Sequence, residues 1–250
     1  MKKTILVTGA SSGIGQATAI ALAKAGHRLI ICGRRAEKLD YTANEFPAGT
    51  ELQKLIFNVA DRAAMEAAID SLPDAWQAID VLVNNAGNAH GLSNVYDADV
   101  ADWDAMIGSN VSGLLYITRK VSEGMVARKR GHIVNVGSIA GRQAYAKGNV
   151  YCATKAAVAM LSDGMRIDLN PYGIKVTTIE PGMVETEFSL VRFKNDAERA
   201  GAVYDRVEAL TAADVADVIA YAIAAPAHVC IADVLILPTA QASVSVVNRQ

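Results

Sequence analysis

The sequence predicts a single α/β domain, a doubly wound and mostly parallel sheet of about seven strands with helices on both faces. Two observations carry this prediction. Short apolar runs rich in β-branched residues alternate with longer, alanine-rich periodic segments along the whole chain, which is typical of βα units. With 52% hydrophobic but only 6% aromatic residues, the 250-residue chain has an aliphatic core, which suits helices packed closely on a parallel sheet.

The β-branched runs locate the strands and the periodic segments locate the helices. We expect strands at Thr4–Thr8, Arg28–Cys32, Glu51–Phe57, Val81–Asn84, His132–Val136, Lys175–Ile179 and Val234–Leu237. We expect helices at Gly13–Ala25, Ala36–Glu45, Arg62–Ser71, Val100–Lys129, Val150–Asn170 and Thr211–Ala224. The segment Val100–Lys129 is long for one unbroken helix. Its Gly108, Gly113 and Gly124 weaken the helix, or else allow close packing against a neighbouring subunit.

Composition argues against several classes of protein. The formal net charge of −2 leaves no basic surface for nucleic acid or for an anionic membrane. No apolar run approaches the roughly 18 residues that a membrane span needs, and the first run ends at Thr8-Gly9. Cys32, Cys152 and Cys230 have neither C-x-x-C spacing nor histidine partners, so we expect no metal site and no disulfide. Reduced thiols favour a cytoplasmic protein.

A glycine-rich turn joins the first predicted strand to the first predicted helix. It reads Thr8-Gly9-Ala10-Ser11-Ser12-Gly13-Ile14-Gly15. Glycines at these places allow a tight turn, close approach of the backbone to a pyrophosphate, and packing of the helix on the sheet. The helix then presents free N–H groups and the positive end of its dipole to an anion. Such a turn is often only structural, but at the first βα junction it predicts dinucleotide binding.

Two arginines follow the second predicted strand, which ends at Cys32-Gly33. A fold that selects NAD usually places an acidic residue there, about 20 positions beyond the glycines, to hold the ribose 2′-hydroxyl. Arg34 and Arg35 instead offer guanidinium groups that match a phosphate. The alternative, a solvated start to the next helix, is disfavoured because helix N-termini repel cations. We therefore predict NADP as the cofactor.

Tyr151 and Lys155 lie four residues apart in a predicted helix, and hence one above the other on one face. A nearby ammonium group favours the phenolate and turns tyrosine into a usable base. Lowering its pKa from about 10 to about 7 requires about 4 kcal/mol. One positive charge at ~4 Å supplies about that amount at an effective dielectric constant of ~20. Alone the pair is weak evidence, since the same spacing occurs on solvated helices.

Further features accompany the glycine-rich turn in a fixed order. They are Asn84-Asn85-Ala86-Gly87, Asn110, Ser138, Tyr151 with Lys155, and Pro181-Gly182 followed by Thr186. Together this set resembles the short-chain dehydrogenase/reductase family along essentially the whole chain. The resemblance implies one Rossmann-type domain over residues 1–250, with a cofactor part at about 1–140, a substrate-covering loop at about 183–208 and a C-terminal tail at 239–250.

The resemblance also implies catalytic roles. Tyr151 is expected to be the acid/base that exchanges a proton with the substrate oxygen. Lys155 is expected to lower the pKa of Tyr151 and to bind the nicotinamide ribose. Ser138 would hold the substrate oxygen, and Asn110 would position a water that relays protons from Lys155. On their own, Ser138 reads as a residue of a turn at a strand end and Asn110 as a polar helix residue bonded to backbone.

The cofactor contacts implied by the resemblance spread over several turns. They are Gly9, Ser11, Ser12, Gly13, Ile14, Gly15, Arg34, Arg35, Asn58, Val59, Asn85, Ala86, Gly87, Tyr151, Lys155, Pro181, Gly182, Val184 and Thr186. The family usually has an aspartate beside the adenine, where this chain has Asn58. The Asn58 side chain still offers an acceptor for the adenine amino group.

Within the family, several segments resemble the NADP-dependent 3-hydroxy acid dehydrogenases of the serine, allo-threonine and malonic semialdehyde type, and the related sulfoacetaldehyde reductases. A small acidic substrate needs a fixed cation, and a guanidinium group suits carboxylate or sulfonate. Arg142 and Arg192 are the candidates, although an exposed arginine is more often only a surface charge. Tyr145 and Phe188 either shape the substrate pocket or pack the covering loop. His90 contacts ligand or is incidental.

Two alternatives stay open at this point. One is a reductase of larger neutral ketones, and the other is an NADPH-sensing scaffold protein without chemistry, which would have no reason to keep Ser138, Tyr151 and Lys155 together. The resemblance also implies a homo-oligomer, usually a homotetramer. Residues 242–247 of the tail have no obvious place in one subunit's sheet, so we expect them to lie across a neighbouring subunit.

Overall fold

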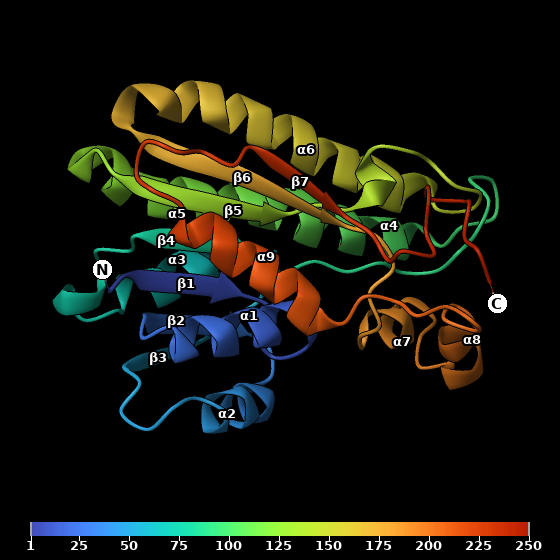
Figure 1. Ribbon diagram of the computed structural model, residues 1–250, viewed down its shortest axis with the longest axis horizontal. Helices are drawn as coiled ribbons and strands as arrows, with labels where there is room; N and C mark the ends of the chain where they lie inside the picture. Colours follow the sequence, from blue (N-terminus) through green and yellow to red (C-terminus); the bar gives the residue numbers. More distant parts are fainter. Residues whose placement is uncertain (1, 250) are drawn as a thin grey trace.

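Seven parallel strands form one sheet in the order β3-β2-β1-β4-β5-β6-β7 (Figure 1). The structure is a computed structural model and describes residues 2–249. The strands are β1 (Thr4–Thr8), β2 (Arg28–Gly33), β3 (Leu52–Ile56), β4 (Val81–Asn84), β5 (Gly131–Val136), β6 (Ile174–Pro181) and β7 (Asp233–Ile236). All six neighbouring pairs are parallel, so the predicted fold class is confirmed, and each strand differs from its prediction by at most two residues at either end.

Helices cover both faces of the sheet because successive strand residues point to opposite sides. On one face Ile5 and Val7 pack with α1, α2 and α9, and on the other Leu6 packs with α3, α5 and α6. Figure 1 shows α9 crossing in front of the sheet and α5 behind it. The helices on the first face are α1 (Gly13–Lys24), α2 (Ala36–Asn44) and α9 (Ala212–Ala224), and those on the second are α3 (Arg62–Asp70), α5 (Gly113–Arg128) and α6 (Asn149–Leu169).

The predicted helix over 100–129 is interrupted in one place. It consists of α4 (Val100–Ile107), a π-helical turn η2 (Gly108–Ser112) and α5, and the backbone stays helical throughout. A side chain at Gly113 would meet Val59 at 2.8 Å, so this glycine lets the helix approach the segment after β3 within the same chain. The sequence suggested that these glycines allow close packing against a neighbouring subunit. At Gly113 the close contact is instead made within the same chain.

The predicted covering loop contains two short helices that the sequence did not indicate. They are α7 (Phe188–Arg192) and α8 (Ala197–Ala202), and Figure 1 shows both beyond the carboxyl ends of the strands. The Asp196 side chain caps α8 by accepting from the backbone N–H of Arg199 at 3.0 Å. The described residues also include the 3-10 turns η1 (Asp74–Trp76), η3 (Ile139–Gly141) and η4 (Asn170–Tyr172). Within residues 2–249, no helix has the length and apolarity that a bilayer crossing requires.

Candidate active site

A cavity of about 840 Å³ opens at the carboxyl ends of the parallel strands, where ligands bind in open α/β sheets. The turns after β1, β2, β3, β4 and β5 line it, together with the start of α6, the covering segment and the tail. Of the residues predicted for the site, all line this cavity except Gly15, Asn110 and Arg142. The cavity therefore joins the expected cofactor and substrate residues in one space.

The glycine-rich turn has the backbone shape that its sequence predicts. Gly9 and Gly13 adopt φ values of 65° and 55°, in the left-handed region that favours glycine. A side chain at Gly15 would collide with the Gly9 carbonyl and the Asn85 amide group, so Gly15 shapes the turn from behind. Ser12 begins α1 without a side-chain cap, which leaves the first N–H groups of the helix for an anion.

Thr8 ties this turn to the turn after β4. Its Oγ1 accepts from the backbone N–H groups of Asn85 and Ala86, both at 2.9 Å, and donates to the Val83 carbonyl at 3.2 Å. The Asn85 amide donates in return to the carbonyls of Thr8 and Gly9 at 3.0 and 3.2 Å. Buried bonds between two turns fix their separation, so this floor of the cavity is preorganised.

The end of β2 presents cations to the same cavity. Arg34 and Arg35 both line it, and Arg35 donates to Ser11 Oγ at 3.4 Å and Ser12 Oγ at 3.3 Å. The Arg35 guanidinium group thus lies over the edge of the glycine-rich turn. Planar N–H donors beside exposed helix N–H groups match the donor set that a phosphate ester requires.

The segment after β3 forms the remaining wall of the cofactor part. Asn58 is exposed and its Oδ1 accepts from the backbone N–H of Ala60 at 3.1 Å, which leaves a second lone pair for a ligand. Val59 is buried and contacts the helix at Gly113. Asp61 does not take the place of the family's aspartate, because its side chain caps α3 through the Ala64 N–H at 3.0 Å.

Ser138, Tyr151 and Lys155 meet where β5 and α6 face the cavity. The Lys155 ammonium group donates to the Val136 carbonyl at 2.9 Å and lies 5.9 Å from the Tyr151 ring centroid. Burial raises the pKa of Tyr151 well above its ordinary value, and a hydrogen bond with Ser138 and the charge of Arg192 offset only part of this rise. Burial also lowers the pKa of Lys155 to about 8.

Burial has the largest influence on the pKa of the Tyr151 phenol in the chain alone, and the Lys155 ammonium group is bonded to a backbone carbonyl. In the chain alone, Tyr151 is therefore held protonated, as a proton donor must be. Activation as a base requires further positive charge in the cavity. The expected lowering of the Tyr151 pKa by Lys155 stays a prediction.

Asn110 lies in the π-helical turn, a feature often found at functional sites. Its Nδ2 donates to the Asn88 carbonyl at 2.8 Å and to Thr154 Oγ1 at 3.1 Å, and its Oδ1 accepts from the Asn88 N–H at 2.8 Å. It thereby holds the segment after β4 against α6. A side chain at Gly87 would stand 3.0 Å from Asn110 Oδ1 and 3.7 Å from Lys155 Nζ, so this glycine keeps the space between them open.

The covering segment, which spans about 183–208, contacts Tyr151 through α7. The centroids of the Phe188 and Tyr151 rings lie 5.6 Å apart, and the angle between the ring planes is 58°. The Arg192 guanidinium carbon lies 5.6 Å from the Tyr151 centroid and 5.3 Å from that of Tyr145. Arg192 Nε donates to the Gly91 carbonyl at 3.3 Å, and its own carbonyl accepts from the Gly91 N–H at 2.9 Å. A cation is thus fixed beside the rings of Tyr145 and Tyr151.

Arg142 occupies a different environment from the one predicted. Its Nε donates to Glu180 Oε2 at 2.6 Å, and the Glu180 carboxylate on β6 is buried. Arg142 does not line the cavity, because its guanidinium group neutralises this carboxylate. The sequence could not distinguish the two arginines, since the partner of Arg142 lies 38 residues away on another strand.

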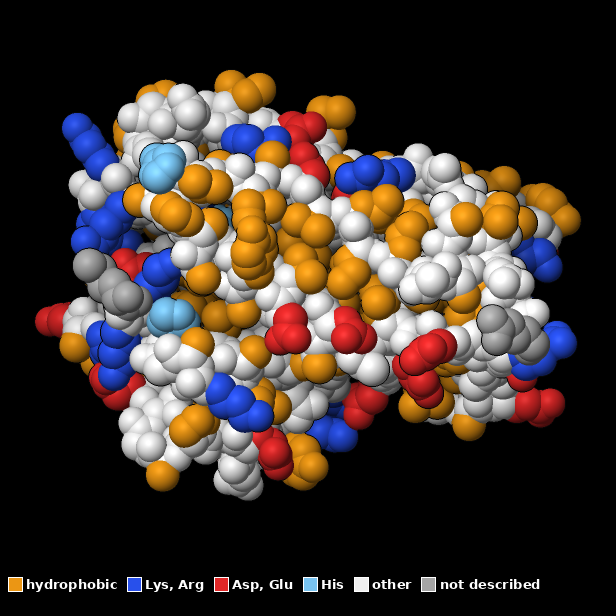
Figure 2. Space-filling model, viewed as in Figure 1, with side chains coloured by type: hydrophobic (Ala, Val, Ile, Leu, Met, Phe, Trp, Pro, Cys, Tyr) orange, Lys and Arg blue, Asp and Glu red, His pale blue; other side chains and the backbone are white. Residues whose placement is uncertain are grey.

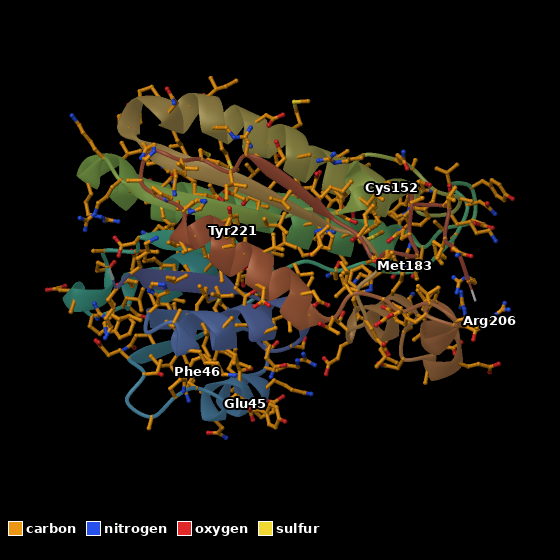
Figure 3. The ribbon with its side chains drawn as sticks, viewed as in Figure 1. Glu45, Phe46, Cys152, Met183, Arg206 and Tyr221 are labelled. Atoms are coloured by element: carbon orange, nitrogen blue, oxygen red, sulfur yellow. The ribbon has the colours of Figure 1, made fainter. Side chains whose placement is uncertain are left out.

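Two anchors of the covering segment were not among the residues predicted for the site. Tyr204 Oη donates to the Val184 carbonyl at 2.9 Å and contacts Ser189 Oγ at 2.7 Å. Gln241 is buried in the tail, and its Oε1 accepts from the Met183 N–H at 2.8 Å. Figure 3 shows Met183 where the carboxyl end of β6 meets the covering segment. Neither residue belongs to a local pattern, so only the tertiary contact reveals its role.

The tail folds over the cavity of its own chain. Gln241 pairs with Val247 in an isolated antiparallel bridge, and the Asn248 N–H donates to the Ala240 carbonyl at 2.8 Å. Val244, Ser245, Val247 and Arg249 line the cavity. Gln241 anchors the tail beside Met183, and the contact of residues 242–247 with a neighbouring subunit stays a prediction.

Two further observations bear on the chemistry of the site. Across residues 2–249, no group of His, Cys, Asp and Glu side chains is arranged to hold a metal ion. Cys32, Cys152 and Cys230 are all free thiols. His90 lines the cavity, and burial lowers its pKa, so it is neutral near pH 7.

Comparisons with known proteins agree with this geometry. A family model described as short chain dehydrogenase matches residues 3–197. The NADP-dependent 3-hydroxy acid dehydrogenase YdfG of Salmonella typhi is 47% identical over 238 residues, 95% of each chain. The NADP-dependent 3-hydroxy acid dehydrogenase of Schizosaccharomyces pombe is 41% identical over 251 residues, 99% of this chain and 97% of that one. Both alignments span nearly the whole chain.

Solved structures show the same similarity in three dimensions. The closed form of serine dehydrogenase complexed with NADP+ superposes with a TM-score of 0.92 at 44% identity, over 99% of this chain and 100% of that one. Serine dehydrogenase from Escherichia coli gives a TM-score of 0.82 at 40% identity, over 96% and 99%. The likeness extends through the covering segment and the tail.

Proposed function

The chain belongs to the short-chain dehydrogenase family, and on that premise we propose that it is an NADP-dependent oxidoreductase of small acidic 3-hydroxy compounds. It would interconvert a 3-hydroxy acid of the serine or allo-threonine type with its carbonyl partner. The observation that carries the substrate class is Arg192, a cation fixed within 5.6 Å of the Tyr151 ring centroid. The names of the relatives support the same class.

NADP fits the residues of the cofactor part. The backbone of the glycine-rich turn and the start of α1 would hold its pyrophosphate, and Arg34 and Arg35 would hold the 2′-phosphate. Asn58 and Val59 would border the adenine, and Val184 and Thr186 the carboxamide. When bound, the cofactor supplies or accepts the hydride and, when oxidised, adds positive charge to the cavity.

The protein's own residues would handle the proton and the oxygen. In reduction, the protonated Tyr151 donates to the carbonyl oxygen, which Ser138 holds within reach of that hydroxyl group. In oxidation, Tyr151 must accept the proton, so its raised pKa has to fall when the cavity gains positive charge. Lys155, with a pKa of about 8, can exchange protons near neutral pH, and Asn110 would position the water that relays them.

Arg192 would bind the carboxylate of the substrate, with Tyr145 and Phe188 enclosing the carbon chain. Arg142 takes no part in this assignment because Glu180 already neutralises it. A guanidinium group can pair with a sulfonate as readily as with a carboxylate, so a sulfoacetaldehyde reductase that forms isethionate is the second candidate. The relatives' names refer to hydroxy acids and serine, which favours the carboxylate.

The proposal is tested by an NADP-linked assay across serine, allo-threonine, 3-hydroxypropionate, isethionate, their aldehyde partners and a bulky neutral ketone. We expect the highest kcat/KM for a carboxylate substrate. Turnover of the neutral ketone alone would indicate a reductase of larger ketones. Binding of NADPH with no turnover of any carbonyl compound would indicate the scaffold.

A substitution tests the anion site directly. Arg192→Met should raise KM for carboxylate substrates about tenfold or more, because a charged hydrogen bond is worth about 1.5–3 kcal/mol. Arg199→Met is the matched control. Arg199, on α8, lies over the Phe193 ring and does not line the cavity. An unchanged KM in Arg192→Met would overturn the assignment.

We further propose that the protein is a cytoplasmic homotetramer. Free thiols support a reducing compartment. Exposed apolar side chains lie on α6 at Met160 and Ile167, on α9 at Tyr221, and on the edge strand β7 at Leu235. Figure 2 shows hydrophobic side chains gathered over α9 and β7, and Figure 3 places Tyr221 there. Light scattering on the purified protein should give the mass of four chains.

A further inference from the structure

Glu187 connects the covering segment to the cofactor part. Its Oε2 pairs with Arg35 Nη2 at 3.2 Å and its Oε1 pairs with Lys38 Nζ at 3.1 Å. Arg35 precedes α2 and Lys38 lies in its first turn, whereas Glu187 directly precedes α7. Each oxygen of one carboxylate therefore has its own cation, contributed by a segment about 150 residues earlier in the chain.

Arg35 lines the part of the cavity that we assign to the 2′-phosphate, and Lys38 is joined to it through the shared Glu187 carboxylate. The same Arg35 nitrogen also donates to Ser11 and Ser12 in the glycine-rich turn. A carboxylate bridging a guanidinium and an ammonium group uses the donors that a phosphate ester would use. A phosphate monoester carries a charge of about −1.5 to −2 at pH 7, so it attracts these cations more strongly and repels the carboxylate.

The residues on either side of Glu187 contact opposite ends of the cavity. The side chain of Thr186 lies 3.3 Å from the place that a side chain on Gly13 would occupy, over the glycine-rich turn. On the other side, Phe188 packs against Tyr151. The two ion pairs of Glu187 are therefore among the contacts that hold a segment touching Tyr151, and their loss frees the start of α7.

We propose that Glu187 is a specificity-determining residue that competes with the cofactor's 2′-phosphate for Arg35 and Lys38. This inference rests on the proposed assignment of Arg35 to that phosphate. A cofactor with the 2′-phosphate displaces the carboxylate and frees the start of α7, while one without it leaves both ion pairs in place. Because binding linkage is reciprocal, removing the carboxylate strengthens binding of the 2′-phosphate.

Isothermal titration with two fragments isolates this competition from catalysis. Adenosine 2′,5′-bisphosphate carries the 2′-phosphate and ADP lacks it, and neither contains nicotinamide. The variants are Glu187→Gln, which removes the charge at constant shape, and Glu185→Gln as the matched control. Glu185 is an exposed carboxylate two residues away on the same segment, and it does not line the cavity.

We expect Glu187→Gln to tighten binding of the bisphosphate about threefold to tenfold and to leave ADP within twofold. Glu185→Gln should change neither affinity by more than twofold. In a background of Arg35→Ala with Lys38→Ala, the gain from Glu187→Gln should disappear. Equal affinities of wild type and Glu187→Gln for the bisphosphate, or an equal gain for ADP, would overturn the proposal.

The variant Arg35→Ala with Lys38→Ala tests the assignment of Arg35 to the 2′-phosphate independently. It should bind the bisphosphate more weakly than wild type, whichever residue stands at position 187.

Discussion

The two halves of the cavity are built in different ways. The cofactor half is fixed by backbone conformation and by bonds between turns, with Thr8 and Asn85 joining the ends of β1 and β4. The substrate half is held by single side chains. Tyr204 bonds to two other residues of the covering segment, whereas Gln241 and Glu187 link that segment to other parts of the chain. A rigid floor therefore faces a covering held by replaceable contacts, as expected where a substrate must enter and leave.

The largest expected effect lies where the halves meet. In the proposed mechanism the Tyr151 hydroxyl group exchanges the proton with the substrate oxygen, so Tyr151→Phe should lower kcat about a hundredfold to ten-thousandfold. The affinity for NADPH, measured by fluorescence titration, should stay within about threefold because the floor is untouched. A kcat within tenfold of wild type would show that another group supplies the proton.

The floor itself is probed at Gly15. A methyl group there collides with the Gly9 carbonyl and the Asn85 amide, neither of which can move without breaking the turn. Gly15→Ala should therefore lower the free energy of unfolding by about 1–3 kcal/mol in urea titrations and weaken NADPH binding. Gly164→Ala is the control, since nothing lies within 4 Å of that position in α6, and it should be neutral or stabilising. Equal stability of both variants would contradict the rigid floor.

The buried lysine predicts a pH dependence of stability. The pKa of Lys155 falls from 10.5 to about 8 in the folded protein, so between these values the unfolded chain binds more protons. Stability contributed at this site therefore rises as pH increases from 8 towards 10, by about 2 kcal/mol, and is constant below 8. Calorimetry should show wild type gaining on Lys155→Met over this interval. A constant difference between the two proteins would refute the shift.

The smallest expected effect on activity concerns the covering segment. Gln241→Ala removes the acceptor of the Met183 N–H, which should cost about 1 kcal/mol and raise KM for the hydroxy acid about threefold. Gln53→Ala, on the distant edge strand β3, is the control and should leave KM unchanged. If Gln241→Ala impairs NADPH binding as strongly as Gly15→Ala does, the two halves are not independent and the contrast fails.

The same contrast explains what the sequence predicted. Gly9, Gly13 and the β-branched strands impose local backbone conformations, so the sheet and the turn could be derived from short patterns. The partner of Arg142 is a buried glutamate on β6, and Gln241 meets Met183 across 58 residues, so neither contact has a local signature. Gly113, which follows the π-helical turn, likewise packs against Val59 in a distant part of the chain.

One consequence concerns exchange of parts between related enzymes. Gly182 has no room for a side chain because the Gln241 amide group occupies that space, while the same amide accepts from the next residue, Met183. Residues 182, 183 and 241 therefore form one unit, and a larger residue at 182 needs a shorter one at 241. A chimaera that imports a foreign covering segment should import the matching tail with it, and libraries that diversify one of these positions should diversify the other in the same clones.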